Sequence, residues 1–286
     1  MVRRKEMVRF FTHSQFHGKS ELTGSDFIRC KQLIKHWPEA DLYKYGENPE
    51  TLIFNKVFCS DDYKFPEHFE GKKILDICDP MWLEGSAIVE TCHAMDVVTT
   101  STEPLAAYIR QFHKKVVVVP DRFDLSVLPT PKEHKGEAKT VVWFGYSHNS
   151  HALKPAMSKV DELNLNLIII SDQDPLDMWH KRDDDRYTFV KYNEDTIYQE
   201  LQKADYALLP DGVGPKDMFK SNNRTIKAQL AGLPVAKTPE EMELYAEEKN
   251  RIDWFNTLYD NIKKDYDVKL SVKELKNIIE NIQEIG

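Results

Sequence analysis

Ten short apolar runs, spread along the whole chain, constrain this sequence more than any other feature. Most are continuously apolar or β-branched, which is typical of strands covered on both faces in parallel sheets. They lie at residues 7–12, 41–45, 51–58, 73–78, 97–100, 115–120, 140–145, 165–171, 187–191 and 206–209. Helical patterns occur at residues 25–36, 85–94, 104–112, 152–163, 196–204 and 225–231. This alternation predicts βαβ units and therefore the α/β fold class.

One polar stretch interrupts the alternation. Residues 126–139 contain two prolines, a glycine and several charges, a composition typical of a linker. We therefore expect two doubly wound, Rossmann-like domains at residues 1–127 and 138–268, and a chain of 286 residues is long enough for both cores. Near the C-terminus, apolar residues recur at helical spacing within residues 272–285, which predicts an amphipathic helix packed against another element.

Charge and cysteine content exclude several classes of protein. A formal net charge of -8 gives no general attraction to nucleic acid or to an anionic membrane. No apolar run is long enough to cross a bilayer, and the N-terminus lacks the pattern of a secretory signal peptide. The cysteines show neither CxxC pairs nor metal-site spacing, which favours free buried thiols in a reducing compartment. We expect a cytoplasmic protein without stable membrane insertion.

In doubly wound sheets, ligands bind beyond the carboxyl ends of the strands, and two such domains facing each other enclose a cleft. In the first domain, residues 12–29 form a predicted polar loop with His13 and His17, which would transfer protons or orient an acceptor. An ordinary surface loop is the equal alternative. Asp79 follows the strand at 73–78, where a general base would stand. The alternative for Asp79 is a turn or a helix cap.

Other polar residues in this domain are explained without a ligand. We expect Ser25 to cap the helix at 25–36, and either Ser101 or Thr102 to cap the helix at 104–112. Asp76, in the middle of a predicted strand, is expected to be structural.

In the second domain, Gly145 directly follows an apolar strand, so that a phosphate could approach the backbone there. Ser147, His148 and Asn149 then offer polar donors. The pattern is not GxGxxG, so an NAD-type site is not supported.

The most informative stretch lies at residues 208–225. A strand is followed by a loop with two glycines and then by a helix whose start is polar and basic. Helix amides, asparagine side chains and two cations would together hold a diphosphate and neutralise its negative charge. N-capping residues on a solvated basic helix are the alternative. The predicted ligand-binding residues of this stretch are Lys220, Ser221, Asn222, Asn223, Arg224 and Lys227.

Five segments, in their order and spacing, resemble those of GT-B glycosyltransferases, in particular the large retaining family known as glycosyl transferases group 1. They are residues 96–105, 116–124, 141–146, 204–210 and 220–235. The resemblance implies a UDP- or GDP-linked sugar donor bound by the second domain and an acceptor bound by the first. It also implies that a C-terminal helix, residues 269–286, packs back on the first domain. Lys227 and Phe219 stand where this family commonly carries two glutamates.

Together with the residues above, the resemblance implies a retaining hexosyltransferase without a cofactor, which moves a sugar from a nucleoside-diphosphate sugar to a hydroxyl acceptor. Lys220 and Arg224 would neutralise the leaving diphosphate, so that no metal is required, and residues 183–185 are interpreted as a solvated acidic loop. If the reaction is inverting, Asp79 is the candidate base. The acceptor stays open between a glycan, a lipid, a protein and a modified DNA base such as a hydroxymethylpyrimidine. The alternatives are a catalytically inactive nucleotide-sugar-binding protein and a sugar-nucleotide epimerase.

Overall fold

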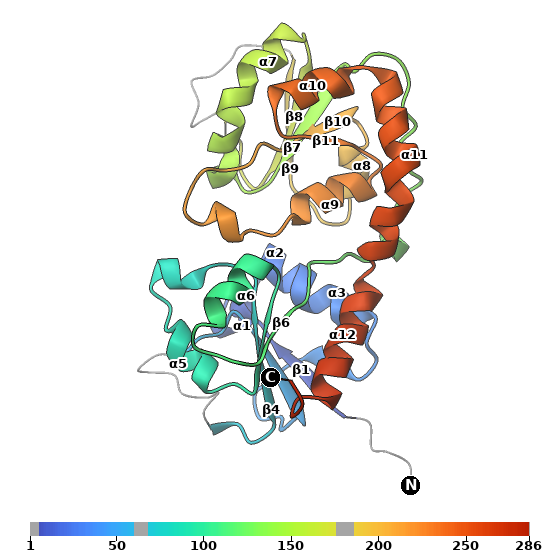
Figure 1. The fold of residues 1–286 in the computed structure, drawn as a ribbon. Coiled ribbons are helices and arrows are strands. Elements are labelled where there is room, and N and C mark those ends of the chain that lie inside the picture. Colours follow the sequence, from blue (N-terminus) through green and yellow to red (C-terminus); the bar gives the residue numbers. More distant parts are fainter. Residues whose placement is uncertain (1–5, 60–67, 176–185, 286) are drawn as a thin grey trace. The chain divides into compact units, whose positions relative to one another are not determined.

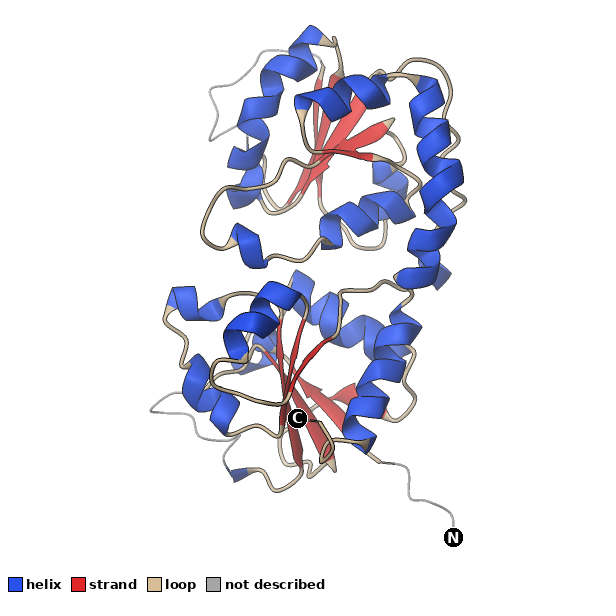
Figure 2. Cartoon of the chain, viewed as in Figure 1, coloured by secondary structure: helices blue, strands red, loops and turns tan. Residues whose placement is uncertain are grey.

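A computed structural model describes residues 6–59, 68–175 and 186–285 of the chain. The chain divides into two compact units. Unit 1 comprises Met1–Asp124, Met218–Ser221 and Asp267–Gly286, and unit 2 comprises Leu125–Asp217 and Asn222–Tyr266. Each unit holds a parallel sheet flanked by helices, drawn red and blue in Figure 2. The α/β class and the two doubly wound units predicted from the strand–helix alternation are thus confirmed.

The described part of unit 1 contains a six-stranded sheet in the order β2-β1-β3-β4-β5-β6, with every neighbouring pair parallel. Its strands are β1 Val8–Phe11, β2 Ala40–Leu42, β3 Thr51–Asn55, β4 Lys72–Ile77, β5 Val97–Thr100 and β6 Val116–Val118. The helical segments of this part of the chain are α1 His13–Phe16, α2 Gly24–Asp26, η1 Phe27–Lys31, α3 Gln32–Lys35, η2 Met81–Glu84, α5 Ile88–His93, α6 Glu103–Ile109 and α12 Val268–Glu280.

Both faces of this sheet are buried. Alternate residues of a strand point to opposite faces, so that Leu52 and Phe54 of β3 join one apolar cluster while Ile53 joins the other. The second cluster includes the apolar side of α12, such as Leu275 and Ile279. In Figure 1, α12 lies beside β1, although the two come from opposite ends of the chain. Coverage on both faces explains why the strands read as continuous apolar runs.

The expected loop after β1 is partly helical. Thr12 caps α1 in a capping box with Gln15, and Thr23 caps α2 in a second box with Asp26. The prediction that Ser25 is the cap is therefore wrong, because Thr23 has the acidic residue three positions later that the box requires. The expectation for α6 is confirmed, with Thr102 as its cap.

The described part of unit 2 contains a five-stranded parallel sheet in the order β11-β10-β7-β8-β9. Its strands are β7 Thr140–Phe144, β8 Asn166–Ser171, β9 Tyr187–Lys191, β10 Tyr206–Leu208 and β11 Val235–Ala236. The helical segments are η3 Leu125–Val127, η4 Ser147–Ala156, α7 Met157–Glu162, α8 Ile197–Leu201, η6 Asp217–Phe219, α9 Asn223–Leu230, α10 Pro239–Ala246 and α11 Glu248–Asp265. Of η6, only Asp217 belongs to unit 2, because Met218 and Phe219 are part of unit 1.

Two elements of unit 2 differ from the prediction. The strand β11 has two residues, too few for a periodic signal. The helix expected at 152–163 is α-helical from Met157 onward, and the part before it is a 3₁₀ helix that contains Pro155. A proline lacks the backbone N–H and crowds the preceding turn, so it is poorly tolerated inside an α-helix.

The described cysteines are all buried and free, as expected. No helix among the described residues combines the length and apolar character needed to cross a membrane.

Candidate functional site

The topology of unit 2 defines where a ligand should bind. From the central strand β7 the chain runs to β8 and β9 on one side, and it then returns to β10 and β11 on the other. The carboxyl ends of β7 and β10 therefore form a topological switch point, where doubly wound sheets bind their ligands. Gly145 follows β7 at this point, and α9 begins after the loop that follows β10. Both were predicted site elements.

Arg224 lies against the end of β7. Its Nη1 atom donates a hydrogen bond of 3.3 Å to the carbonyl oxygen of Phe144. A Cβ atom at Gly145 would lie 2.9 Å from the same nitrogen, so the absence of a side chain at Gly145 leaves space for the guanidinium. Burial lowers the pKa of Arg224, while Asp217 and Asp211 act in the opposite direction. The structure thus brings together Gly145 and a desolvated cation at the switch point.

The residues after Gly145 form the start of η4. The backbone N–H of Ser147 donates to Asp172 at 2.7 Å. Burial disfavours the charge on Asp172, but hydrogen bonds led by that of Ser147 outweigh burial and lower its pKa. His148 is exposed and stacks on Tyr146 with ring centroids 5.7 Å apart, and the backbone of Asn149 donates to the Tyr146 carbonyl at 2.9 Å. Asp172 was not predicted, and its place directly after β8 is the signal that would have found it.

The start of α9 was predicted to supply asparagine and lysine ligands. Asn222 occupies the N-cap position but makes no side-chain capping bond. Its amide donates to the Tyr266 hydroxyl at 3.2 Å instead. Asn223 is the first residue of the helix and is half-buried, whereas Lys220 is exposed and belongs to unit 1. The predicted set of ligands is therefore divided between the two units.

Lys227 is not on a solvated helix face, because only 5% of it is exposed. Its Nζ atom lies 2.7 Å from Oε1 of Glu194 and 3.0 Å from the Tyr192 hydroxyl. Burial lowers the pKa of Lys227, and Glu194 counteracts this. The hydroxyl of Tyr192 also donates to Glu194. The charge of Lys227 is thus matched by a carboxylate from the loop after β9, a residue that the sequence did not single out.

The topology of unit 1 gives a second switch point. The chain runs from β1 to β2 on one side and to β3 on the other, so the ends of β1 and β3 meet there. His13 follows β1, and its Nδ1 lies 3.3 Å from the carbonyl oxygen of Lys56, just after β3. The Nζ atom of Lys56 lies 2.7 Å from Oδ2 of Asp79, after β4. The two residues predicted for the acceptor side therefore converge on Lys56, which was not predicted.

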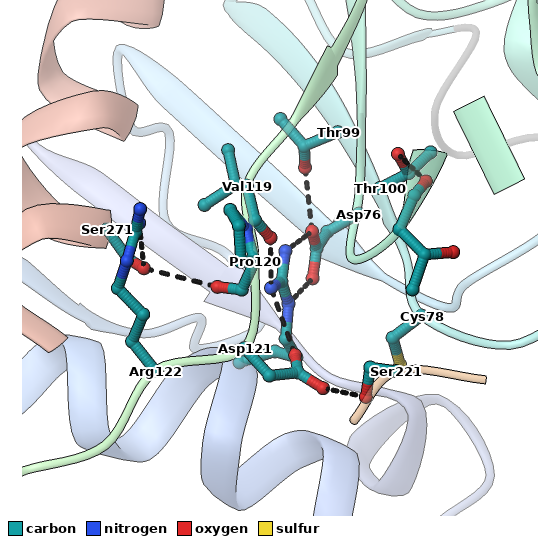
Figure 3. A network of polar contacts seen from close by, with 12 residues as sticks. Asp76, Cys78, Thr99, Thr100, Val119, Pro120, Asp121, Arg122, Ser221 and Ser271 are labelled. Atoms are coloured by element: carbon teal, nitrogen blue, oxygen red, sulfur yellow. Dashed lines mark hydrogen bonds and ion pairs between the residues drawn. The ribbon is translucent and has the colours of Figure 1, made fainter. Parts of the chain in front are cut away.

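Asp76 has the structural role expected for it. Its carboxylate accepts two hydrogen bonds from Arg29, at 3.0 and 2.6 Å, and one each from Asn55 and Thr99 at 2.9 and 2.7 Å. Figure 3 shows the hydrogen bond from Thr99 to Asp76, and the side chains of Arg29 and Asp76 are almost fully buried. Burial opposes the charge on Asp76, but the guanidinium and the hydrogen bonds prevail and lower its pKa.

The same network reaches one of the predicted donor ligands. Arg29 also contacts Asp121 at 3.1 Å and donates to the Val119 carbonyl at 2.6 Å. The Ser221 hydroxyl donates to Asp121 at 2.5 Å, within unit 1 (Figure 3). The Ser221 hydroxyl, predicted as a ligand-binding group, thus has a carboxylate partner within unit 1.

Residues 183–185, interpreted above as a solvated acidic loop, lie outside the described residues. Within the described ranges, no group of three or more histidine, cysteine, aspartate or glutamate side chains could hold a metal ion.

No protein-family model matches the sequence. No curated protein matches it either. Solved structures do share its fold. HepE from Anabaena, in complex with UDP, aligns with a TM-score of 0.61 at 11% identity over 96% of this chain and 100% of its own. WaaB, a lipopolysaccharide outer core galactosyltransferase, aligns with a TM-score of 0.56 at 11% identity over 96% of this chain and 99% of its own.

TarM aligns with a TM-score of 0.61 at 12% identity, over 80% of this chain and 54% of its own, so the chain spans about half the length of TarM. At such identities, structural likeness establishes the fold. The chain therefore has the GT-B fold, built from two α/β units with parallel sheets.

Proposed function

We propose that this protein is a glycosyltransferase that moves a sugar from a nucleoside-diphosphate sugar to a hydroxyl acceptor. The observation that carries the proposal is the place of Arg224, at the switch point of unit 2 and against Gly145. A departing diphosphate develops negative charge, and preorganised cations and helix amides stabilise that charge. Arg224 stands in the first turn of α9 and presents a guanidinium, whose planar fork matches phosphate oxygens.

The finer features of the reaction belong to the same proposal. UDP is the preferred donor nucleotide, with GDP as the alternative, because UDP accompanies both HepE and a mutant of S. aureus TarM in their crystal structures. Arg224 and the α9 amides would stabilise the leaving diphosphate without a metal ion, and the transfer would retain the configuration of the hexose. Unit 1 would bind the acceptor through His13 and Asp79. A cytoplasmic location is part of the proposal.

One observation favours a second candidate, a protein that binds nucleotide sugars without transferring them. Lys227 stands where the family that this chain resembles commonly carries a glutamate, and its ammonium is buried against Glu194. The carboxylate that this family commonly has at that helix position is therefore replaced by an ammonium, whose charge is balanced by Glu194. Binding without turnover is therefore the outcome that would distinguish the second candidate from the first.

A panel of nucleotide sugars tests both candidates. The protein is mixed with UDP-, GDP-, TDP- and CMP-linked sugars, and its thermal unfolding and the release of nucleotide are measured with and without EDTA. A ligand at a hundred times its Kd stabilises the folded state by about 2.7 kcal/mol. We expect stabilisation by at least one nucleotide sugar, and nucleotide release that rises with an acceptor and is insensitive to EDTA. Binding without release on glycan, lipid, protein and DNA acceptors favours the second candidate, and failure to bind any donor refutes both.

A further inference from the structure

Lys56 has an uncommon backbone conformation at a place where ligands bind. Its φ of 51° lies in the left-handed region, and in the described part of the chain the other non-glycine residue with positive φ is Asn164. Asparagine tolerates that region, whereas a lysine is seldom found there. The backbone N–H of Lys56 donates to the Asp76 carbonyl at 3.0 Å, which keeps the residue in line with β4. Strained residues that the surrounding structure holds in place concentrate at functional sites.

The side chain of Lys56 holds one of the two predicted acceptor residues. Only 10% of this side chain is exposed, and its ammonium lies 2.7 Å from the Asp79 carboxylate. Asp79 keeps 42% of its own side chain exposed. A buried ammonium requires a partner, so the pair fixes one edge of the carboxylate while the rest of the side chain faces solvent.

The backbone of Lys56 holds the other predicted residue. A carbonyl oxygen only accepts hydrogen bonds, so the contact of 3.3 Å requires that Nδ1 of His13 carries the proton. Burial lowers the pKa of His13; the hydrogen bond to the Lys56 carbonyl acts against burial and the charge of Lys56 acts with it, and the net lowering favours the neutral ring. In this tautomer Nε2 is an acceptor, and it has no hydrogen-bond partner among the described residues.

We propose that Lys56 is the positioning residue of an acceptor site in unit 1, where it orients Asp79 through its ammonium and His13 through its carbonyl. The inference rests on the proposed transferase function and adds the class of acceptor. The Lys56–Asp79 pair and a neutral imidazole together carry no net charge. The Asp79 carboxylate accepts hydrogen bonds, as does Nε2 of His13, which has no partner among the described residues, so the site suits the hydroxyl groups of a glycan, which donate them.

Steady-state transfer with variants of the full chain tests the role of Lys56. Lys56→Met removes the ammonium at nearly constant volume, and we expect kcat to fall at least tenfold. The Kd for the donor should stay within twofold of wild type, because unit 2 carries the donor site. Lys56→Arg keeps the charge and should recover part of kcat. Lys44→Met, which removes a lysine that is 73% exposed in unit 1, is the matched control and should transfer like the wild type.

A double-mutant cycle separates positioning from a general structural effect. If Lys56 acts through Asp79, the double variant Lys56→Met/Asp79→Asn should lose no more kcat than the worse single variant. Losses that multiply would overturn the proposal, as would a Lys56→Met variant with wild-type kcat. If Lys56→Met does not fold, the Lys56→Arg and Asp79→Asn variants carry the test, and equal kcat for both and for wild type overturns it.

A measurement without turnover distinguishes failure of this inference from failure of the transferase proposal. Nitrogen-15 NMR of labelled histidines reports which ring nitrogen of His13 carries the proton, with the resonance assigned from a His13→Gln variant. The expected state is the neutral Nδ1–H tautomer, also in Lys56→Met, because the carbonyl remains. An Nε2–H tautomer in the wild type would overturn the role of the carbonyl, whether or not any donor is turned over. Absence of donor binding with the expected tautomer would refute the transferase instead.

Discussion

Replacing Arg224 by alanine should weaken the binding of a nucleoside diphosphate and leave the fold of unit 2 intact. The guanidinium lies at the switch point with one hydrogen bond of 3.3 Å, to the Phe144 carbonyl. Charge-assisted hydrogen bonds contribute about 1.5–3 kcal/mol each. One such bond to a phosphate therefore corresponds to about a 10-fold to 150-fold increase in Kd when it is lost. Arg224→Lys keeps the charge but not the planar fork, and its Kd should lie between those of the wild type and Arg224→Ala.

Arg224→Ala should change the free energy of unfolding only slightly. Burial lowers the pKa of Arg224, which shows that its charge is partly desolvated in the folded protein, and the substitution removes this desolvated charge. Isothermal titration with UDP and GDP gives the Kd, and thermal unfolding without ligand gives the stability. Lys203→Ala is the matched control, since it removes the same charge from an exposed pair with Glu200 in unit 2. An Arg224→Ala variant that binds within twofold of a binding-competent wild type would refute the phosphate role of this residue.

Three further changes test the surroundings of the site and the core. Gly145→Ala places a Cβ near the guanidinium of Arg224 at a φ of 152°, so it should cost about 1–3 kcal/mol of stability by thermal unfolding and raise the Kd for nucleotide. Glu194→Gln leaves the buried ammonium without its carboxylate and should lower the unfolding free energy in urea by about 1–3 kcal/mol, whereas an unchanged midpoint would contradict the pairing. Asp76→Asn should lower the free energy of unfolding by about 3–5 kcal/mol at neutral pH, because it leaves the buried Arg29 without the Asp76 carboxylate. Because the folded-state pKa of Asp76 is depressed, its contribution to stability is fully present above the unfolded-state pKa of about 4 and is lost as the pH falls from there through the folded-state pKa. The variant should therefore unfold with a weaker dependence on acid pH than the wild type.

The α/β class could be predicted from the periodicity of apolar residues, because strands buried on both faces need apolar residues at every position and helices need them at a different period. The sequence also located residues at strand ends, such as Gly145 and Asp79, since a doubly wound sheet gathers its carboxyl ends at one edge. Capping was predictable where a single local pattern governs it, as at Thr102, and failed at Ser25, where Thr23 has the better-spaced partner.

Which of these residues contact each other could be seen only in the folded chain. Lys227 pairs with Glu194 across 33 positions of sequence, and Arg29 pairs with Asp76 across 47. Lys56 contacts both His13 and Asp79, although the sequence places it inside the predicted strand at 51–58 and nothing nearby distinguishes it. The physical reason is that apolar burial is encoded locally, by periodicity, whereas the partner of a buried charge is any opposite charge that the packed chain brings within a few ångströms.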